Sequence, residues 1–539
     1  MRTWLLVVLL VPTSVLSQKD INVSVSNYLR YGTGTETVSS VSRRRDYFEN
    51  LTESRITFSE FLVGFRLLFD SPPEFGVDFT GLKKRYVEFK KDDLSIRAGD
   101  SFSLYGRGLA LNLFENRGLA FDTGLDGLKM EYKTRLLKLA LTGGDIKYVD
   151  VLDLTRTELY QIRAGAIELS PYPFFSFGMN FVTGKFRLPP PTFPDHRAQF
   201  DIPEYFGRVR IADVDVYVSY AEKRTTEYGD TSGTHLGTAF YGSVAYTQES
   251  FGVSLEYKDY RFGIADPYDR DDRNRSKKAY AFQNAPIVFK EHTFTLLSRY
   301  PHVIDFNDEV GYQADVFYTL GQFTGSLNAS VASRHYSFAP TGDTSAIFLP
   351  IYGSKPRKNS FLPSLESKYS PFWEVYTDMI YYLVEGGNDY VEIGFDRRSN
   401  EIAEKLPTLA VEATRTTGVP LAVQYSLHSG WVVKFVSEHQ WVYESTNYAQ
   451  TNYYNHLFSL GLSKSPEYSV TLRYEFTSDG GTVDRRKNWT ALDFAFRLSD
   501  SHRITLTAGG DRGGQICANG VCRIINPFLG FRASILSYL

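Results

Sequence analysis

The feature that most constrains the fold is a nearly regular two-residue alternation of apolar and polar side chains that recurs along the chain. The clearest examples are the segments 213–220, 309–320, 468–476 and 492–498. In 309–320, every second residue from Val310 to Leu320 is apolar, while the other face includes Glu309, Gln313 and Asp315. Because successive strand side chains point to opposite faces, each segment predicts a β-strand with one apolar and one polar face.

The length and aromatic content of these segments favour a membrane-embedded sheet over a soluble one. A soluble antiparallel sheet with one solvated face would show the same alternation. The segments are, however, roughly 9 to 13 residues long, whereas soluble strands have about five or six residues and transmembrane strands about 9–11. Aromatic residues close the apolar faces, as Phe175, Phe177 and Phe181 do, and aromatic girdles are typical of outer-membrane barrels.

Connections between the segments fall into a short class and a long class that largely alternate. The short ones are Ala212-Asp213, Gly321-Gln322 and residues 248–250, 386–389, 464–466 and 499–501. The long, polar ones are residues 186–203, 224–236, 263–308, 335–370 and 442–455. Outer-membrane barrels have short periplasmic turns and long extracellular loops, whereas a soluble sandwich has no reason to sort its loops by end.

The sequence therefore predicts an all-β fold: a single large transmembrane antiparallel β-barrel of about 22–24 strands, with long extracellular loops. We expect about 24 strands, with about 22 as the alternative, since bacterial barrels prefer even counts. The charged segments Arg85 to Lys90 and Leu94 to Asp100 are the least regular candidates. Outside the N-terminus, no apolar run approaches the ~20 residues that a transmembrane helix needs.

The N-terminus predicts the compartment. A basic start, Met1-Arg2, precedes an apolar stretch that ends near Val15-Leu16-Ser17. This is the pattern of a secretory signal peptide. We therefore expect residues 1–17 to be a signal peptide and residues 18–539 to form the barrel, surrounded by lipid in the bacterial outer membrane.

Composition and motifs argue against several function classes. The 59 basic and 62 acidic residues give a net charge of −3, so no basic field favours nucleic acid as a partner. No metal-protease spacing, nucleophile elbow or Walker loop occurs, and we expect no enzyme activity, no metal and no cofactor. Asp266, Asp269, Asp271 and Asp272 are interleaved with arginines and lysines, which argues against a calcium loop.

The two cysteines, Cys517 and Cys522, flank the dipeptide Asn519-Gly520. Asn-Gly is a strong signal for a two-residue hairpin turn, which brings the flanking residues together. In an exported protein such a pair is expected to form a disulfide rather than stay as two free thiols. We therefore predict a disulfide that staples the tip of an extracellular hairpin.

Two stretches, residues 101–127 and 279–308, mix apolar and charged side chains without a lipid-facing side. A barrel of about 22 strands has a lumen wide enough to need a plug or infolded loops. We predict that both stretches fold inward and constrict the pore, with loops packed on the extracellular rim as the alternative. The side chains expected to face the luminal water are Arg107, Arg117, Asp122, Arg299 and His302. Gly106 and Gly108 form only part of a phosphate-loop pattern, because Leu111 stands in place of its third glycine.

The residues around Gly99-Asp100, Tyr105 to Leu109 and Arg117 resemble an uncharacterised family of outer-membrane β-barrel proteins from Bacteroidetes-type Gram-negative bacteria. The segments from Pro286 to Gly311 and from Cys517 to Arg523 carry the same resemblance in the same order. It therefore extends over nearly the whole chain. The resemblance implies an outer-membrane barrel and supplies no activity.

The predicted inner wall carries both charge signs, as Asp315, Arg473 and Glu475 illustrate. Such a lumen is polar and gives no clear ion preference. We expect porin-like or gated passage of small solutes across the outer membrane. The alternative is a non-transporting barrel that acts as a scaffold or surface-binding component of a secretion or assembly complex, with other envelope proteins as partners.

Overall fold

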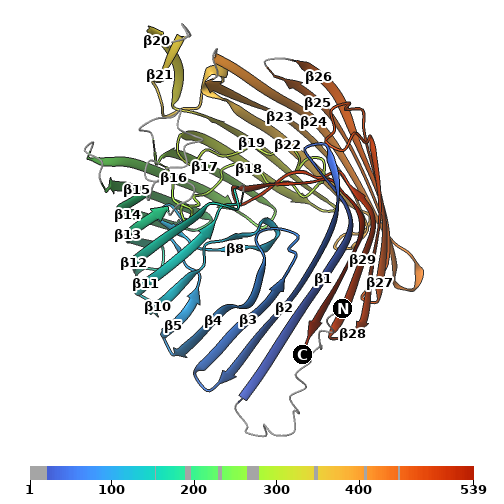
Figure 1. Cartoon of the computed structure of the whole chain (residues 1–539), viewed down its shortest axis with the longest axis horizontal. Helices are drawn as coiled ribbons and strands as arrows, with labels where there is room; N and C mark the ends of the chain where they lie inside the picture. Colours follow the sequence, from blue (N-terminus) through green and yellow to red (C-terminus); the bar gives the residue numbers. More distant parts are fainter. Residues whose placement is uncertain are drawn as a thin grey trace.

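Antiparallel strands pair all the way round a closed β-barrel (Figure 1). The computed structural model describes residues 21–151, 153–188, 196–228, 233–263, 278–344, 350–405, 409–446 and 449–539. Strand β1 (Ile21–Val38) pairs with β2 (Val41–Phe58) on one side and with β32 (Phe528–Tyr538) on the other, which closes the sheet. The 24-stranded sheet confirms the predicted all-β barrel and the higher of the two expected strand counts.

The remaining elements belong either to the wall or to the connections between its strands. The other wall strands are β3 (Phe61–Asp70), β4 (Phe79–Lys91), β5 (Leu94–Ser101), β10 (Leu125–Lys133), β11 (Leu137–Val149), β12 (Thr157–Tyr172), β13 (Phe175–Leu188), β14 (His196–Ile211), β15 (Val214–Glu227), β16 (Thr234–Thr247), β17 (Phe251–Arg261), β18 (Glu309–Leu320), β19 (Phe323–Ser333), β22 (Phe372–Tyr382), β23 (Tyr390–Lys405), β24 (Leu409–Ser426), β25 (Trp431–Ser445), β26 (Gln450–Lys464), β27 (Tyr468–Thr477), β28 (Asn488–Ser499) and β29 (His502–Asp511). The connections contain β6 (Leu104–Tyr105), β7 (Leu111–Asn112), β8 (Glu115–Asn116), η1 (Arg117–Leu119), β9 (Phe121–Asp122), β20 (Tyr336–Thr344), β21 (Pro350–Pro356), η4 (Ser367–Tyr369), η5 (His428–Gly430), β30 (Gly514–Ala518) and β31 (Val521–Ile525). Among the described residues, no helix is long and apolar enough to cross a membrane.

The two-residue alternation places apolar side chains on the outside of the wall and polar ones on the inside. On β13, Phe177 and Phe181 remain 43% and 39% exposed on the outer face. On the inner face, Asp315 of β18 accepts hydrogen bonds from Gln313 at 3.0 Å and from Asn328 at 2.6 Å. A closed barrel with an apolar, aromatic-rich outer wall and a polar inner wall is a transmembrane barrel of the bacterial outer membrane.

The six predicted short connections and the two longest connections lie at opposite ends of the barrel, as predicted. All six predicted short connections join wall strands at one end, which is therefore the periplasmic end. The connections between β17 and β18 and between β19 and β22 lie at the other, extracellular end. The turn Ser39-Ser40 between β1 and β2 is a tight turn at this extracellular end.

Three of the predicted long loops are largely strand instead. The β13–β14 ladder continues to the pair Leu188 and His196, and the β25–β26 ladder continues to Ser445 and Gln450. Residues 224–236 likewise belong mostly to β15 and β16. The polar side chains of these segments mark where the strand leaves the hydrocarbon, whereas the backbone ladder continues because its N–H and C=O groups still need partners.

The wall is uneven in height where β5 and β10 lie. These strands have 8 and 9 residues, whereas β1 and β2 have 18 each. β4 pairs with β5 only as far as Tyr86 and Gly99, and β10 pairs with β11 only as far as Leu125 and Ile146. The wall therefore has a notch at its extracellular edge, between the upper parts of β4 and β11.

Two predictions fall outside the described residues. The predicted signal peptide, residues 1–17, precedes the first described residue, Ile21. The aspartate cluster that we weighed as a calcium loop lies within residues 264–277. The signal peptide and the argument against a calcium loop therefore stay predictions.

Candidate functional site

Three connections from the extracellular end fold back into the barrel, and we refer to them together as the plug. They are residues 102–124 between β5 and β10, residues 278–308 between β17 and β18, and residues 512–527 between β29 and β32. Figure 1 shows β8 of the first connection within the ring of wall strands. The first two connections correspond to the two stretches that were predicted to fold inward.

The three parts of the plug are hydrogen-bonded to one another. The Asn112 backbone N–H donates to the Phe282 carbonyl at 2.8 Å, and the Gln283 side chain donates to the Leu109 carbonyl at 3.1 Å. The Arg523 guanidinium of the third part donates to the carbonyl of residue 119 at 3.1 Å. The plug therefore forms one connected body inside the lumen.

The glycine-rich turn of the first part packs against a wall carboxylate. Gly106 and Gly108 have positive φ angles of 57° and 88°, and a Cβ at Gly106 would lie 2.4 Å from the Glu204 carboxylate. Glu204, buried on β14, accepts hydrogen bonds from the Ser219 hydroxyl at 2.6 Å and from the Ala110 backbone N–H at 3.3 Å. Backbone N–H groups of a turn commonly bind anions. Here the anion is the protein's own carboxylate, which accounts for the partial phosphate-loop pattern.

One side of the plug makes an apolar core with the inner wall of β11–β17. Leu109 and Leu111 are fully buried, and Phe282 packs against Phe200 of β14 with ring centroids 5.6 Å apart. The core also includes buried wall residues such as Ile162. Apolar residues are therefore found on the lumen side of this part of the wall, which explains why residues 101–127 are rich in apolar side chains without having a lipid-facing side.

The second part of the plug crosses the lumen to the opposite wall. Glu438 of β25 accepts hydrogen bonds from the backbone N–H groups of Thr295 at 3.0 Å and Leu296 at 2.6 Å. Arg398 of β23 donates to the Leu297 carbonyl at 2.5 Å. Glu438 and Arg398 are both buried. Each of these two buried wall residues therefore has a hydrogen-bond partner in the plug.

Arg299, one of the predicted luminal residues, joins the plug to β27. Its guanidinium forms an ion pair with Glu475. Arg512 of the third plug part lies 3.4 Å from the same carboxylate and donates to Asn455 at 2.7 Å. Two plug segments are therefore held at one wall carboxylate.

His302, another predicted luminal residue, is 7% exposed and lies in a buried contact with the wall. Its ring stacks on Phe372 with centroids 4.2 Å apart, and its Nε2 atom lies 3.2 Å from the Glu309 carboxylate. Lys258 of β17 also pairs with Glu309 at 2.5 Å and donates to the Ile287 carbonyl at 2.7 Å. His302 therefore belongs to a network that fixes the end of the second plug part.

His292, Glu374 and Asp396 form a cluster whose ligand types would suit a divalent cation. One ligand atom of each lies within 4.8 Å of the others. Arg398 enters the same cluster, with its Nε atom 3.3 Å from Glu374 and 3.0 Å from Asp396. Burial lowers the pKa of His292, against the effect of its hydrogen bond to Glu374. Because the guanidinium compensates carboxylate charge, we describe the cluster as a charge network that holds the plug at β22 and β23.

The first plug part is attached to β2–β4 by ion pairs. Arg117 pairs with Glu49 of β2, and Asp122 lies 3.1 Å from Lys84 of β4. Glu115, beside them, pairs with Arg66 of β3 at 2.7 Å. The predicted residues Arg117 and Asp122 thus come together with wall partners on neighbouring strands.

Like Arg117, the predicted luminal residue Arg107 has an exposed side chain. Its guanidinium lies 5.0 Å from the centroid of the Tyr217 ring, near the periplasmic start of β15. Within the part of the chain that the structure describes, no carboxylate forms a salt bridge with Arg107. Arg107 therefore presents its charge at the periplasmic side of the plug.

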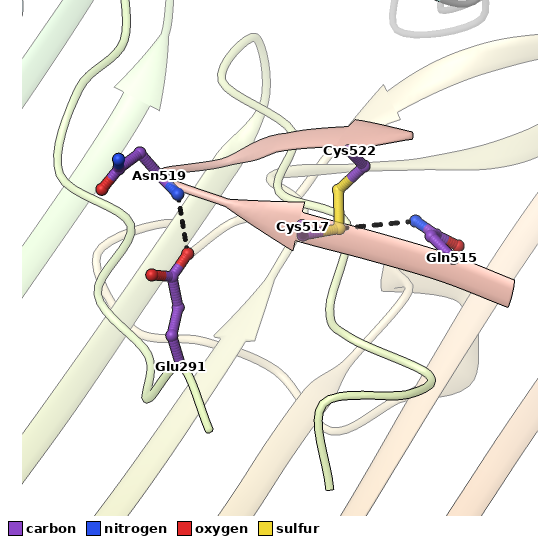
Figure 2. The surroundings of a disulfide bond; sticks show 5 residues. All are labelled: Glu291, Gln515, Cys517, Asn519 and Cys522. Atoms are coloured by element: carbon purple, nitrogen blue, oxygen red, sulfur yellow. Dashed lines mark hydrogen bonds between the residues drawn. A yellow bond between two sulfur atoms is a disulfide. The ribbon is translucent and has the colours of Figure 1, made fainter. Parts of the chain in front are cut away.

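The third plug part is a hairpin closed by the predicted disulfide. Cys517 and Cys522 are bonded with their Cα atoms 4.1 Å apart, and Asn519 and Gly520 both have positive φ. The Asn519 backbone N–H donates to Glu291 at 2.7 Å (Figure 2). The expectation that this hairpin forms an extracellular tip is corrected here, because its turn rests on the second plug part inside the lumen.

A cavity of about 550 Å³ remains between the plug and the wall formed by β1, β2, β26–β29 and β32, and we call it the luminal cavity. Five arginines and three carboxylates line it: Arg30, Arg299, Arg473, Arg512, Arg532, Glu74, Glu475 and Asp511. Several form ion pairs with one another, such as Arg473 with Asp511 at 3.4 Å. The lining carries a formal excess of two positive charges, from five arginines minus three carboxylates.

Sequence reasoning missed the wall residues that hold the plug, among them Glu204, Glu438 and Arg398. They stand at inward strand positions, where the alternation predicts polar residues in any barrel. Their pattern does not distinguish a residue that faces water from one that binds a plug. The one signal that the sequence did contain is a charged residue in the middle of a strand, at a position that the structure shows to be buried.

Three solved structures are similar to the chain at low identity. A siderophore receptor, PirA, from Pseudomonas aeruginosa is 9% identical, with a TM-score of 0.44 over 96% of this chain and 80% of that one. The translocation pore of the P pilus usher PapC is 7% identical, with a TM-score of 0.39 over 96% and 99%. OccK5 (OpdH) from Pseudomonas aeruginosa is 12% identical, with a TM-score of 0.34 over 74% and 97%. At TM-scores below 0.5 these similarities carry no argument, and no curated protein matches the sequence.

A protein family matches most of the sequence. Residues 4–334 and 392–539 match DUF6029, a family of unknown function. The two matched ranges contain all three parts of the plug and most of the wall strands. The chain therefore belongs to the DUF6029 family of unknown function.

Proposed function

We propose that the barrel passes small polar solutes across the outer membrane and that the plug opens and closes this path. The observation that carries the proposal is how the plug is held. Its attachments to the wall are side-chain hydrogen bonds, ion pairs and apolar contacts, such as those of Glu438 and Glu475. These contacts can break while the backbone ladder of the wall stays intact, so a movement of the plug does not require unfolding of the barrel.

The predicted luminal residues take two roles in this proposal. Arg107 faces water at the periplasmic side and narrows the path there, which its exposure supports. Arg117, Asp122, Arg299 and His302 hold the plug to the wall through their ion pairs and hydrogen bonds. Loss of an anchor is therefore expected to favour the open path, whereas loss of Arg107 is expected to change conductance and ion selectivity.

The luminal cavity supports a preference for anionic solutes. Lumen charges tune the selectivity of outer-membrane barrels, and this lining has an excess of arginines over carboxylates. Each of the five arginines forms an ion pair, and two of the partners, Glu49 and Asp493, lie outside the lining, so the preference is expected to be small. Guanidinium groups suit carboxylate and phosphate groups because their donors match two acceptor oxygens at once.

The reversal potential of the protein in planar bilayers, measured in a salt gradient, tests this function. Wild-type openings are expected to be anion-selective, and Arg473→Gln and Arg532→Gln are expected to reduce that selectivity. Arg415→Gln, which changes an exposed arginine at the extracellular end of β24, is the matched control and is expected to leave selectivity unchanged. Cation-selective openings would overturn the anion preference, and a barrel that stays closed even with its plug anchors removed would overturn solute passage.

A second candidate function is favoured by the extracellular connection between β19 and β22. Its β20–β21 hairpin projects beyond the barrel rim (Figure 1). In the same connection, Phe361, Leu362 and Leu365 are 69%, 55% and 67% exposed. Such an apolar surface suits contact with another envelope protein. Crosslinking in intact cells tests this role: a specific partner that is lost in Phe361→Ser/Leu365→Ser supports a scaffold, and no change in crosslinked products argues against it.

The host and the export route are inferred from the sequence. The resemblance described above supports a Bacteroidetes-type Gram-negative bacterium as the host. We infer that residues 1–17 are removed on export, because their pattern is that of a signal peptide. N-terminal sequencing of the protein purified from outer membranes is expected to begin at Gln18, and a chain that retains Met1 would contradict this inference.

A further inference from the structure

The outer wall of β11–β14 carries exposed cations directly above its apolar belt. Cross-strand pairing places Leu141, Gly165 and Phe181 in one outward row. Leu141 and Phe181 are 46% and 39% exposed, so this row belongs to the lipid-facing belt. Arg163 lies on β12 two residues from Gly165, towards the extracellular side. Lys185 lies in the outward row that follows. The outward side chains therefore change from apolar to cationic between one row and the next.

The next outward row towards the extracellular rim adds three more cations. Lys147 and Arg187 both lie opposite Leu159, one on each side of it. Arg187 lies directly opposite Arg197 on β14.

Apart from Arg163, which lies one row below, these cations line a groove of about 1020 Å³ at the notch, and the groove continues inward to Asp122 and Gly124 of the plug. Lys185 and Arg187 of β13 and Arg197 of β14 line one side of the groove, with Gln161 of β12 beside Lys185. The other side carries a row of carboxylates, namely Asp100, Asp126 and Asp145. Lys147 lies on β11 near Asp145, and Lys83 and Lys84 of β4 also line the groove, so six cations and four carboxylates line it in all.

Three of the cations have their charge available for a ligand. Lys147, Arg163 and Lys185 are exposed. No salt bridge joins any of them to a carboxylate within the residues described for this structure. Their depth, in the rows next to the apolar belt, is the depth of the lipid headgroups. Clusters of lysine and arginine at this depth recognise phosphorylated headgroups, and both residue types bind phosphate.

We propose that this groove binds the phosphorylated sugar headgroup of the glycolipid that forms the outer leaflet of the outer membrane. The occupant follows from charge complementarity and from depth. Lys147, Arg163 and Lys185 contact the phosphates, and the exposed apolar row below them contacts the acyl chains. The three contact residues lie on the outer face of the wall, so the proposal does not depend on solute passage.

Binding of purified outer-leaflet glycolipid to the detergent-purified full-length protein, measured by native mass spectrometry, tests the proposal. Wild type is expected to bind the phosphorylated glycolipid and not its enzymatically dephosphorylated form. Lys147→Gln/Arg163→Gln/Lys185→Gln is expected to weaken binding on the order of 100-fold, from three lost headgroup contacts. Arg44→Gln/Arg397→Gln/Arg415→Gln changes exposed arginines of β2, β23 and β24 and is expected to bind like wild type.

Two results would overturn the proposal. One is equal binding of the phosphorylated and dephosphorylated glycolipids by wild type. The other is equal loss of binding in the groove variant and in the control variant, which would indicate a diffuse charge effect. Heat-modified gel mobility reports whether the triple variant is folded. If it is not, Lys185→Gln alone is used, with Arg397→Gln as its control and the same expected order of affinities.

Discussion

At the residue scale, the buried charges in the middle of wall strands are the most informative feature. An unpaired buried charge costs several kcal/mol, so such a residue needs a partner. Glu204, Arg398 and Glu438 each find at least one partner in the plug rather than relying only on a neighbouring strand. The wall and the plug are therefore complementary at specific side chains, and each of these contacts can be tested by one substitution.

Glu438→Gln is expected to loosen the second plug part. The carboxylate accepts two backbone N–H groups with its two oxygens, and glutamine retains only one acceptor oxygen. The loss of one such contact costs about 1–3 kcal/mol, which is roughly 5- to 150-fold in local opening. Hydrogen exchange of the Thr295 and Leu296 amides measures this effect. Glu392→Gln, on the inner face of β23 without a plug contact among the described residues, is the control, and unchanged amide protection in Glu438→Gln would contradict the anchor role.

His335 makes the extracellular connection between β19 and β22 sensitive to pH. Burial opposes its charge, but ion pairs with Asp259 at 3.0 Å and Asp308 at 2.7 Å outweigh burial and raise its pKa. The stabilisation of this connection by protonated His335 is therefore complete below the pKa of about 6.5 that the histidine has in the unfolded chain. It is lost as the pH rises through the raised pKa of the folded protein. Proteolysis of this connection is expected to speed up as the pH rises above about 6.5, after correction for protease activity.

The histidine accounts for this pH dependence only if its removal abolishes it. His335→Gln is expected to be cleaved at a high rate that hardly changes over the same pH range. His428→Gln, in the periplasmic turn η5, is the control and is expected to keep the wild-type pH dependence. A wild-type rate that is flat with pH, or a His335→Gln rate that still rises with pH, would show that another group titrates.

At the scale of elements, the sequence predicts the wall strands well and the plug only in part. The alternation of β18, β27 and β28 follows from burying one face, so it can be read locally. Residues 101–127 and 279–308 were predicted to fold inward because they lack a lipid-facing side. The position of the disulfide hairpin was not predictable, because Asn519-Gly520 determines a turn but not which side of the wall it lies on. The anchors depend on contacts such as Thr295 with Glu438, 143 residues apart.

Replacement of Cys517 and Cys522 by serine is expected to loosen the third plug part. The disulfide closes a short loop and so limits the conformational entropy of the opened hairpin. Its loss is expected to favour local opening by about 2 kcal/mol, which is roughly 30-fold in the opening equilibrium. The Asn519 amide, which donates to Glu291, is expected to exchange faster by about this factor. Reduction of the wild-type protein provides an independent control with the same expected outcome. An Asn519 amide that exchanges at the wild-type rate in both cases would contradict a role of the disulfide in holding this part.

At the scale of the whole molecule, the wall and the plug are held together by different interactions. The wall is a continuous ladder of backbone hydrogen bonds that closes on itself at β1 and β32. The plug is held inside it by side-chain contacts and leaves the luminal cavity beside it. Because the ladder does not depend on the plug, we expect the barrel to remain folded when a part of the plug is removed.

The most direct test of this central claim is the single-channel conductance of a variant in which residues 279–307 are replaced by a short glycine-serine linker. Wild type is expected to show little or no steady conductance, and the variant is expected to show large, stable openings, since the removed segment crosses the lumen. A variant that lacks β20 and β21, which lie outside the lumen, is the control and is expected to behave like wild type. Equal conductance of wild type and the 279–307 variant, with both barrels folded, would contradict the claim that this segment closes the pore.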